Sequence, residues 1–291
     1  MRIYHQPVMV KEVLEILQPE RGGIFVDCTT GEGGHSLALL QSLPPPSTLV
    51  CIDRDEEMLE IAKERLKAFP HKIHFYKANF PQLQPILAEL GINEVDGILF
   101  DLGISSRQIE IPERGFSFQS EGPLDMRMDR NQSLSAEDLV NRLSKKELAR
   151  VFREYGEEPF AERIAAAIVE RRKRKRISST RELAEIVEKV VRRRRRIHPA
   201  TRVFMALRIA VNKELEELRS ALPMAISLLK RGGRLCVLSY HSLEDRIVKE
   251  SFRKRKDELN IITPKPLRPS REEVSINPSA RSARLRAAER R

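Results

Sequence analysis

The sequence contains no tryptophan, only 5% aromatic residues and three cysteines among 291 residues. Cys28, Cys51 and Cys236 are far apart, and each lies in an apolar run typical of a strand. An odd number of scattered cysteines does not form a disulfide framework and fits no zinc-site spacing. We therefore expect core thiols in a reducing compartment.

Long apolar runs are also missing. No stretch is apolar enough to span a bilayer, and residues 1–17 lack the sustained apolar segment of a signal peptide. We expect a cytoplasmic protein without membrane contact. The sequence has no HExxH, paired CxxC, Walker lysine loop or serine nucleophile elbow. Metal hydrolysis, ATP hydrolysis and acyl transfer therefore lack support, and we expect no metal site.

Acidic residues are outnumbered by basic ones. Lys and Arg total 53 against 42 Asp and Glu, a formal net charge of +11, which favours a polyanionic partner such as nucleic acid. Each basic block alone is also compatible with a solvated charged face. Taken together the blocks indicate phosphate contacts. They comprise residues 171–176, 192–196, 253–256 and 281–291.

The first hundred residues alternate between strand and helix patterns. Apolar runs predict strands at residues 24–28, 49–52, 73–76 and 95–100, each followed by a helix or turn signal. Repeated βα units predict a parallel sheet with helices on both faces. Ligands bind such sheets at the carboxyl ends of the strands, so polar residues at those ends are candidates for a site.

The stretch IFVDCTTGEGGHS, residues 24–36, joins the first strand to a helix. Gly33 and Gly34 let a ligand approach the backbone N–H groups of the helix start, although a plain βα turn also needs glycine. A dinucleotide fingerprint requires a third glycine where Ser36 stands, which disfavours NAD. S-adenosylmethionine (AdoMet) has no phosphate, and its amino acid end and ribose suit a glycine turn with a nearby acid.

Three further strand ends carry candidates. Asp53 closes the second strand about twenty residues beyond the glycine turn, as a ribose-binding acid does, although it could instead be a helix N-cap. Phe80 follows the third strand, where it could stack on an adenine or belong to the core. Asp101 closes the fourth strand.

The pattern changes after Asp101. Residues 102–132 read as a long irregular loop, and capping boxes beginning at Ser135, Ser144 and Ser179 then predict helices. A long helix is expected over residues 204–222. A strand at residues 235–239 should lie beside the fourth strand and bring Tyr240 and His241 to the same edge. His241 could be a catalytic base or a hydrogen-bonding structural histidine.

The sequence resembles the RsmH (MraW) family in motifs that run nearly from end to end, including DCTTGEGGHS, GILFDLGISSRQIE, PLDMRMD, HPATRVFMALRIAVNKEL and GGRLCVLSYHSLEDRIVK. The family consists of AdoMet-dependent methyltransferases that modify the N4 amino group of a cytosine in the decoding region of 16S ribosomal RNA. The resemblance implies an α/β fold with a class I, Rossmann-like methyltransferase sheet and an inserted all-helical second domain. Residues 1–110 and 215–291 would form the methyltransferase domain, and residues 111–214 the helical domain for RNA recognition.

The resemblance also implies roles for individual residues, with AdoMet as cofactor and 16S ribosomal RNA, within the small ribosomal subunit, as partner. The cofactor residues would be Gly33, Gly34, His35, Asp53, Phe80, Asp101 and Gln108. Asp101 is also the candidate catalytic acceptor for the amine hydrogens. Hypothetical substrate contacts are Ser105, Tyr240, His241, Arg192, Arg193 and Arg194.

Two other classes of function stay open at this point. A methyltransferase acting on another RNA or on a small molecule would share the cofactor residues. A non-catalytic RNA-binding module would use the basic blocks but not the polar strand ends. The sequence does not decide between a monomer and a homodimer.

Overall fold

The computed structural model describes residues 6–191 and 198–291. The chain divides into two compact units. The sheet unit consists of Met1–Gly103 and Leu215–Arg291, and the helical unit of Ile104–Glu214, which begins ahead of the expected residue 111. Among the described residues, no helix combines the length and apolar character needed to cross a membrane.

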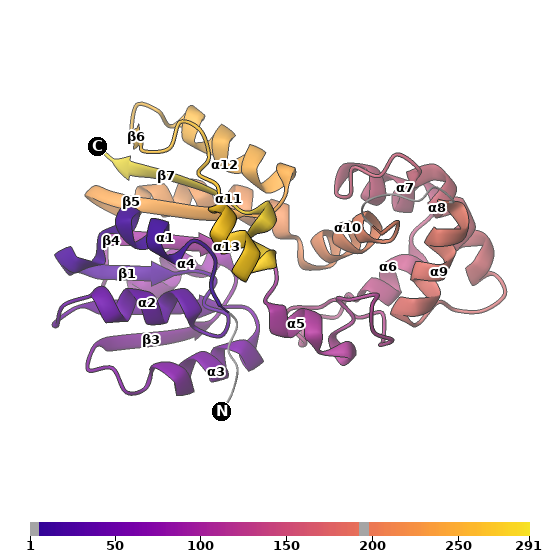
Figure 1. Ribbon diagram of the computed structural model, residues 1–291, viewed down its shortest axis with the longest axis horizontal. Helices are drawn as coiled ribbons and strands as arrows, with labels where there is room; N and C mark the ends of the chain where they lie inside the picture. The colour runs from indigo at the N-terminus through magenta and orange to yellow at the C-terminus, as the bar shows by residue number, and fades with distance from the viewer. Residues whose placement is uncertain (1–5, 192–197) are drawn as a thin grey trace. The chain divides into compact units, whose positions relative to one another are not determined.

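The sheet unit is built on a seven-stranded sheet with the order β3-β2-β1-β4-β5-β7-β6 (Figure 1). Parallel pairing joins the strands from β3 to β5, whereas β7 is antiparallel to both β5 and β6. The predicted α/β fold with a parallel sheet and a helical insertion is confirmed. The strands are β1 Ile24–Asp27, β2 Thr48–Asp53, β3 Lys72–Lys77, β4 Val95–Asp101, β5 Leu229–Ser239, β6 Leu259–Ile261 and β7 Arg284–Arg290.

Helices cover both faces of this sheet, because its strands bury apolar side chains in both directions. Leu49 and Cys51 of β2 belong to the cluster that α1 and α2 cover, while the alternate residues Val50 and Ile52 are equally buried. All three cysteines are free and buried, as predicted. The helices of the unit are α1 Val10–Leu17, η1 Pro19–Arg21, α2 Gly34–Ser42, α3 Glu56–Leu66, η2 Phe80–Gln82, α4 Leu83–Glu89, α11 Glu214–Ser227 (whose first residue lies in the helical unit), α12 Ser242–Lys254, α13 Arg271–Ile276 and η4 Pro278–Ser282.

Strand β5 is longer than predicted. The sequence predicted a strand at residues 235–239, but the strand begins at Leu229 and passes through Gly232 and Gly233. Its register against β4 shifts between Val95 and Gly97, and Gly232 has a φ of 79°. Residues 230–233 of β5 therefore stand opposite Asp96 alone, and this irregularity lets the strand continue through the two glycines.

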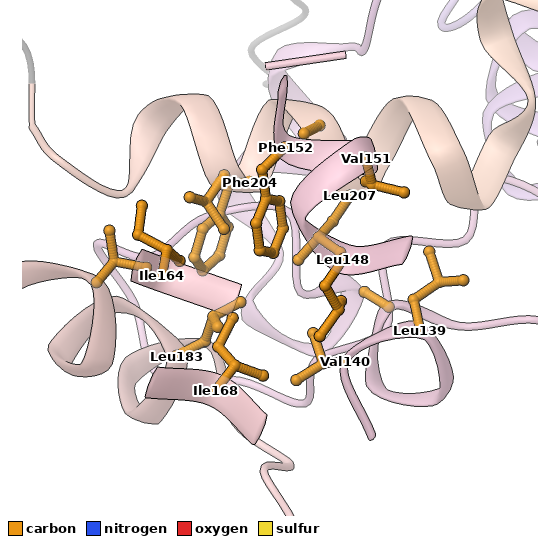
Figure 2. Close-up of a cluster of buried hydrophobic side chains, with 14 of the residues drawn as sticks. Leu139, Val140, Leu148, Val151, Phe152, Ile164, Ile168, Leu183, Phe204 and Leu207 are labelled. Atoms are coloured by element: carbon orange, nitrogen blue, oxygen red, sulfur yellow. The ribbon is translucent and has the colours of Figure 1, made fainter. Parts of the chain in front are cut away.

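The helical unit packs amphipathic helices around an apolar core (Figure 2). Ser135, Ser144 and Ser179 are the N-caps of three of its helices, as predicted, and each side chain accepts a backbone N–H three residues later. The core contains Leu139, Val140, Leu148, Val151, Phe152, Ile164, Ile168, Leu183, Phe204 and Leu207. The helices are α5 Ser106–Glu110, η3 Pro112–Arg114, α6 Ala136–Arg142, α7 Lys145–Glu154, α8 Ala161–Arg172, α9 Thr180–Val190 and α10 Thr201–Asn212.

Two predictions for this region were wrong. The helix expected over residues 204–222 is two helices, α10 and α11, because Lys213 adopts a left-handed conformation with a φ of 51° and ends α10. The expected loop of residues 102–132 contains α5 and η3. Ser105 and Gln108 form a capping box that stabilises the single turn of α5.

Candidate functional site

The glycine turn lies between the carboxyl end of β1 and the start of α2. Gly31 and Gly33 have φ values of 51° and 78°, which other residues rarely adopt. A Cβ on Gly33 would lie 3.2 Å from Ala62 Cβ, whereas a Cβ on Gly31 would meet only Thr29 O at 3.9 Å. The turn is therefore packed against α3 at Gly33 and open at Gly31.

Gly34 is the first residue of α2 and packs against the N-terminal segment. A Cβ there would lie 3.2 Å from Pro7 Cβ. The close approach of Pro7 is therefore sufficient to explain a glycine at this position, whether or not a ligand binds there. Replacing Gly34 would disturb Pro7 as well as the helix start, which makes it a poor residue for testing ligand binding.

Asp53 joins two strand ends. Its Oδ2 accepts a hydrogen bond from Gly31 N at 2.7 Å, and its Oδ1 accepts one from Asp55 N at 2.8 Å. Enclosure of the carboxylate raises the pKa of Asp53 to about 6, although these two hydrogen bonds act in the opposite direction. Asp55, not Asp53, is the N-cap of α3. Asp53 is therefore an acid held against the glycine turn.

Asp101, at the carboxyl end of β4, is contacted by Tyr240, which follows β5, and by His35 of α2. Tyr240 Oη donates a hydrogen bond to Asp101 Oδ1 at 2.7 Å, and His35 Nε2 lies 3.3 Å from Asp101 Oδ2. Asp101 N donates to Thr29 Oγ1 at 2.6 Å. The Asp101 side chain is 23% exposed, so it remains accessible to a ligand.

His35 is buried on α2 beside several carboxylates. Burial lowers the pKa of His35, but Asp101, with weaker contributions from Asp27 and Glu273, outweighs it and leaves the pKa above 6.5. Its Nδ1 has no hydrogen-bond partner among the described residues. An unsatisfied buried nitrogen is costly in a finished core, which suits a position that a ligand completes.

Asp27 is a buried acid at the end of β1 that sequence reasoning did not select. Its Oδ2 accepts a hydrogen bond from Ser36 Oγ at 2.7 Å, and its Oδ1 accepts one from Thr29 N at 3.1 Å. Burial raises the pKa of Asp27. Asp27 thus bonds to residues on both sides of the glycine turn. The sequence signal that could have identified it is an acid at the end of an apolar strand.

Phe80 follows β3 and is partly buried. Its ring lies edge-on to Phe100, with centroids 5.1 Å apart, and the Arg54 guanidinium carbon is 5.5 Å from its centroid. Arg54 also forms an ion pair with Glu217 of α11. No sequence signal predicts that pair, because its partners are 163 residues apart.

His241 caps a helix. As the N-cap of α12, its Nδ1 accepts a hydrogen bond from Glu244 N, and its Nε2 lies 3.1 Å from Glu244 Oε1. These contacts favour the structural histidine over the catalytic base. Tyr240, its neighbour, is the residue that contacts Asp101.

Ser105 and Gln108 belong to the helical unit. Their side chains cap α5: Ser105 N donates to Gln108 Oε1 at 3.0 Å, and Gln108 N donates to Ser105 Oγ at 3.1 Å. The cofactor role of Gln108 and the substrate role of Ser105 stay predictions.

Three residues of the first basic block form ion pairs within the helical unit. Arg171 pairs with Glu182 at 2.5 Å, Lys173 pairs with Glu170 at 2.7 Å, and Arg176 pairs with Glu137. Intramolecular pairing thus accounts for much of this block. Arg192, Arg193 and Arg194 of the second block lie outside the described residues.

The carboxyl edge of the sheet therefore gathers acids from three strands beside an open glycine turn and the N–H groups of α2. Such a set can accept hydrogen bonds from hydroxyl and amino groups while the helix start binds a carboxylate. In residues 6–191 and 198–291, no cluster of three His, Cys, Asp or Glu side chains could hold a metal ion. The geometry suits a polar organic ligand.

Known proteins match the whole chain. The sequence fits the MraW methylase family over residues 2–291. It is 50% identical over 293 residues to ribosomal RNA small subunit methyltransferase H of Persephonella marina, covering 99% of each chain. It is also 50% identical over 298 residues to the protein of that name from Pseudothermotoga lettingae, covering 100% of each. The resemblance predicted from the motifs is confirmed, and the chain belongs to the MraW methylase family.

Proposed function

We propose that the protein transfers a methyl group from AdoMet to the N4 amino group of a cytosine in the decoding region, at the P site, of 16S ribosomal RNA. The observation that carries this proposal is the meeting of Asp53, Asp101 and the glycine turn at one edge of the sheet. Family membership and the names of the relatives support ribosomal RNA of the small subunit as the substrate.

The residues present fit AdoMet. Gly31 leaves open space beside Asp53, whose carboxylate can accept hydrogen bonds from ribose hydroxyls. The start of α2, with Gly34 and His35, offers N–H groups to the methionine carboxylate. Phe80, which follows β3, would border the adenine. When bound, AdoMet supplies a methyl group already activated on a sulfonium.

The protein's own task is to prepare the amine. The exocyclic amine of cytosine is a weak nucleophile because its lone pair is delocalised into the ring. Holding it about 3 Å from the methyl group, and in line with the departing sulfur, removes most of the entropic barrier. The Asp101 carboxylate accepts a hydrogen bond from the amine, stabilises the positive charge that develops on its nitrogen as the methyl carbon passes from sulfur to nitrogen, and receives the proton that the nitrogen then loses. Asp101 is thus the proposed catalytic residue.

A cytosine inside folded RNA must leave its stack before it reaches such a carboxylate. We propose that the helical unit binds the phosphates around that base. Because three residues of the first basic block pair with acids of the helical unit, we place this contact on Arg192, Arg193 and Arg194.

The test is to incubate the protein with labelled AdoMet and small ribosomal subunits that lack the modification, and then map the labelled nucleotide. We expect one labelled cytosine, methylated on N4. Label on another RNA or on a small molecule would reassign the substrate. Binding of RNA without AdoMet binding in calorimetry would show a non-catalytic RNA-binding module.

Binding to the same subunits, measured over a range of salt concentrations, tests the second basic block. Changing Arg192, Arg193 and Arg194 to Gln should weaken subunit binding and reduce the dependence of its affinity on salt, by roughly one in the log–log slope for each lost phosphate contact. The matched control changes three exposed charges of α7, Lys145, Lys146 and Arg150, to Gln. Equal slopes for the two triple variants would exclude the second block as the contact.

A further inference from the structure

We infer that Tyr240 is a positioning residue of this site, whose phenol fixes the Asp101 carboxylate in the orientation that receives the substrate amine. This inference rests on the proposed function. It gives Tyr240 a different role from the direct substrate contact expected from the sequence.

The parallel pairing of β4 and β5 brings the two residues together. Asp101 is paired with Leu238, so Tyr240 lies just beyond the adjacent strand end. Its Oη donates to Asp101 Oδ1 at 2.7 Å, the length of a strong hydrogen bond to a carboxylate. His35 approaches Oδ2 at 3.3 Å without hydrogen-bond geometry, so the phenol is the better-aligned of the two contacts.

The ring of Tyr240 is held independently of its hydroxyl. Tyr240 N donates to Glu244 Oε2 at 2.8 Å, and the ring packs against the apolar cluster beneath α1 and α2. Gly103, with a φ of 104°, lies close to the ring: a Cβ there would be 3.4 Å from Tyr240 Cδ2. Removing the hydroxyl alone should therefore leave the ring and the backbone in place.

The phenol stays a donor over the neutral pH range. Burial and the charge of Asp101, with Glu244 and Glu273 nearby, raise the pKa of Tyr240 well above 10. A carboxylate has about four lone-pair positions, and this bond uses one of them. Fixing one oxygen in this way orients the remaining acceptor positions before the substrate arrives, as electrostatic preorganisation requires.

The experiment compares Tyr240→Phe, Asp101→Asn and the double variant in methyl transfer to unmodified small subunits, from pH 6 to 9. The control is Tyr76→Phe, which removes a phenol that donates to Glu89 at the exposed side of β3. Binding of S-adenosylhomocysteine is measured for each variant by calorimetry.

We expect Tyr240→Phe to lower kcat about tenfold, the usual effect of losing one hydrogen bond to a charged group. Affinity for S-adenosylhomocysteine should change less than about twofold, which a general disturbance of the site would not allow. The double variant should be no slower than Asp101→Asn alone, because the phenol acts only through that carboxylate. Tyr76→Phe should match the wild type.

Three results would overturn the inference: a normal kcat for Tyr240→Phe, a loss confined to cofactor affinity, or independent effects that multiply in the double variant. Failure of the proposed function looks different. A wild-type chain that binds S-adenosylhomocysteine but methylates no subunit RNA overturns the reaction itself, and this inference with it.

Discussion

The two units of the molecule treat charged side chains in different ways. In the sheet unit, burial is the largest influence on the pKa of Asp27 and of Asp53, and raises both. In the helical unit the pKa of the exposed Glu147 is lowered chiefly by a hydrogen bond from Ser144, and that of the partly buried Asp138 chiefly by one from Ser135. Burying an ionisable acid reduces the stability of the folded protein, and acids with strongly shifted pKa values cluster at functional sites.

The buried polar groups of the helical unit have structural partners instead. Arg114 is almost fully buried and donates to the carbonyls of Arg127 and Met128. Asn212 joins α10 to the backbone at Met126 and Met128. These hydrogen bonds attach the loop at residues 126–128 to η3 and α10. Buried acids with raised pKa values thus lie in the sheet unit, whereas Arg114 and Asn212 in the interior of the helical unit form hydrogen bonds to the backbone.

The strongest test of this separation is Phe152→Ala. Phe152 is fully buried in the helical core, so the variant should destabilise the helical unit by about 3–5 kcal/mol. Hydrogen exchange, read separately for each unit, measures the effect, and calorimetry with S-adenosylhomocysteine should show unchanged affinity. A large loss of cofactor affinity would mean that cofactor binding depends on the core of the helical unit.

The next effect concerns Asp53 and pH. Because its pKa is about 6, protonation on lowering the pH from 7.5 to 5 should weaken S-adenosylhomocysteine binding roughly tenfold if the charged carboxylate binds the ribose. The sign for folding is opposite: a raised acid pKa means that the contribution of Asp53 to stability is lost as the pH rises from 3.8 to about 6.

Asp53→Asn is the control for this titration. It should bind more weakly at pH 7.5 and lose the part of the pH dependence centred near 6. Any dependence left in the variant belongs to other groups, among them His35. An Asp53→Asn titration that still follows the wild type would remove Asp53 from the cofactor site.

The smallest effect is expected for Ser135→Ala. Ser135 caps α6 and exchanges hydrogen bonds with Asp138, so its loss should cost about 1 kcal/mol of unfolding free energy in the helical unit. Asp138 has a lowered pKa, so its contribution is present above 3.8 and declines as the pH falls below that value. The exposed Ser133→Ala provides the control, measured by the same hydrogen exchange. Equal stabilities would show that the cap contributes nothing.

Much of this fold was predictable because its signals are local. Continuous apolar runs identified β1 to β4, and the serine caps located three helix starts. The short α5 was missed although Ser105 and Gln108 carry the capping-box spacing, because no apolar stripe follows it. The break at Lys213 was missed because nothing in the side chain of lysine predicts a left-handed backbone.

The site divides in the same way. The sequence alone determined that acids and glycines follow the strands, and that these strands form one parallel sheet whose carboxyl ends meet. Only the tertiary structure decided that Tyr240 donates a hydrogen bond to Asp101, that His241 caps a helix and that Arg54 pairs with Glu217. The strength of a hydrogen bond depends on the donor–acceptor distance to within tenths of an ångström and on the angle at the hydrogen. Between residues as far apart in sequence as Tyr240 and Asp101, only strand register and packing set them.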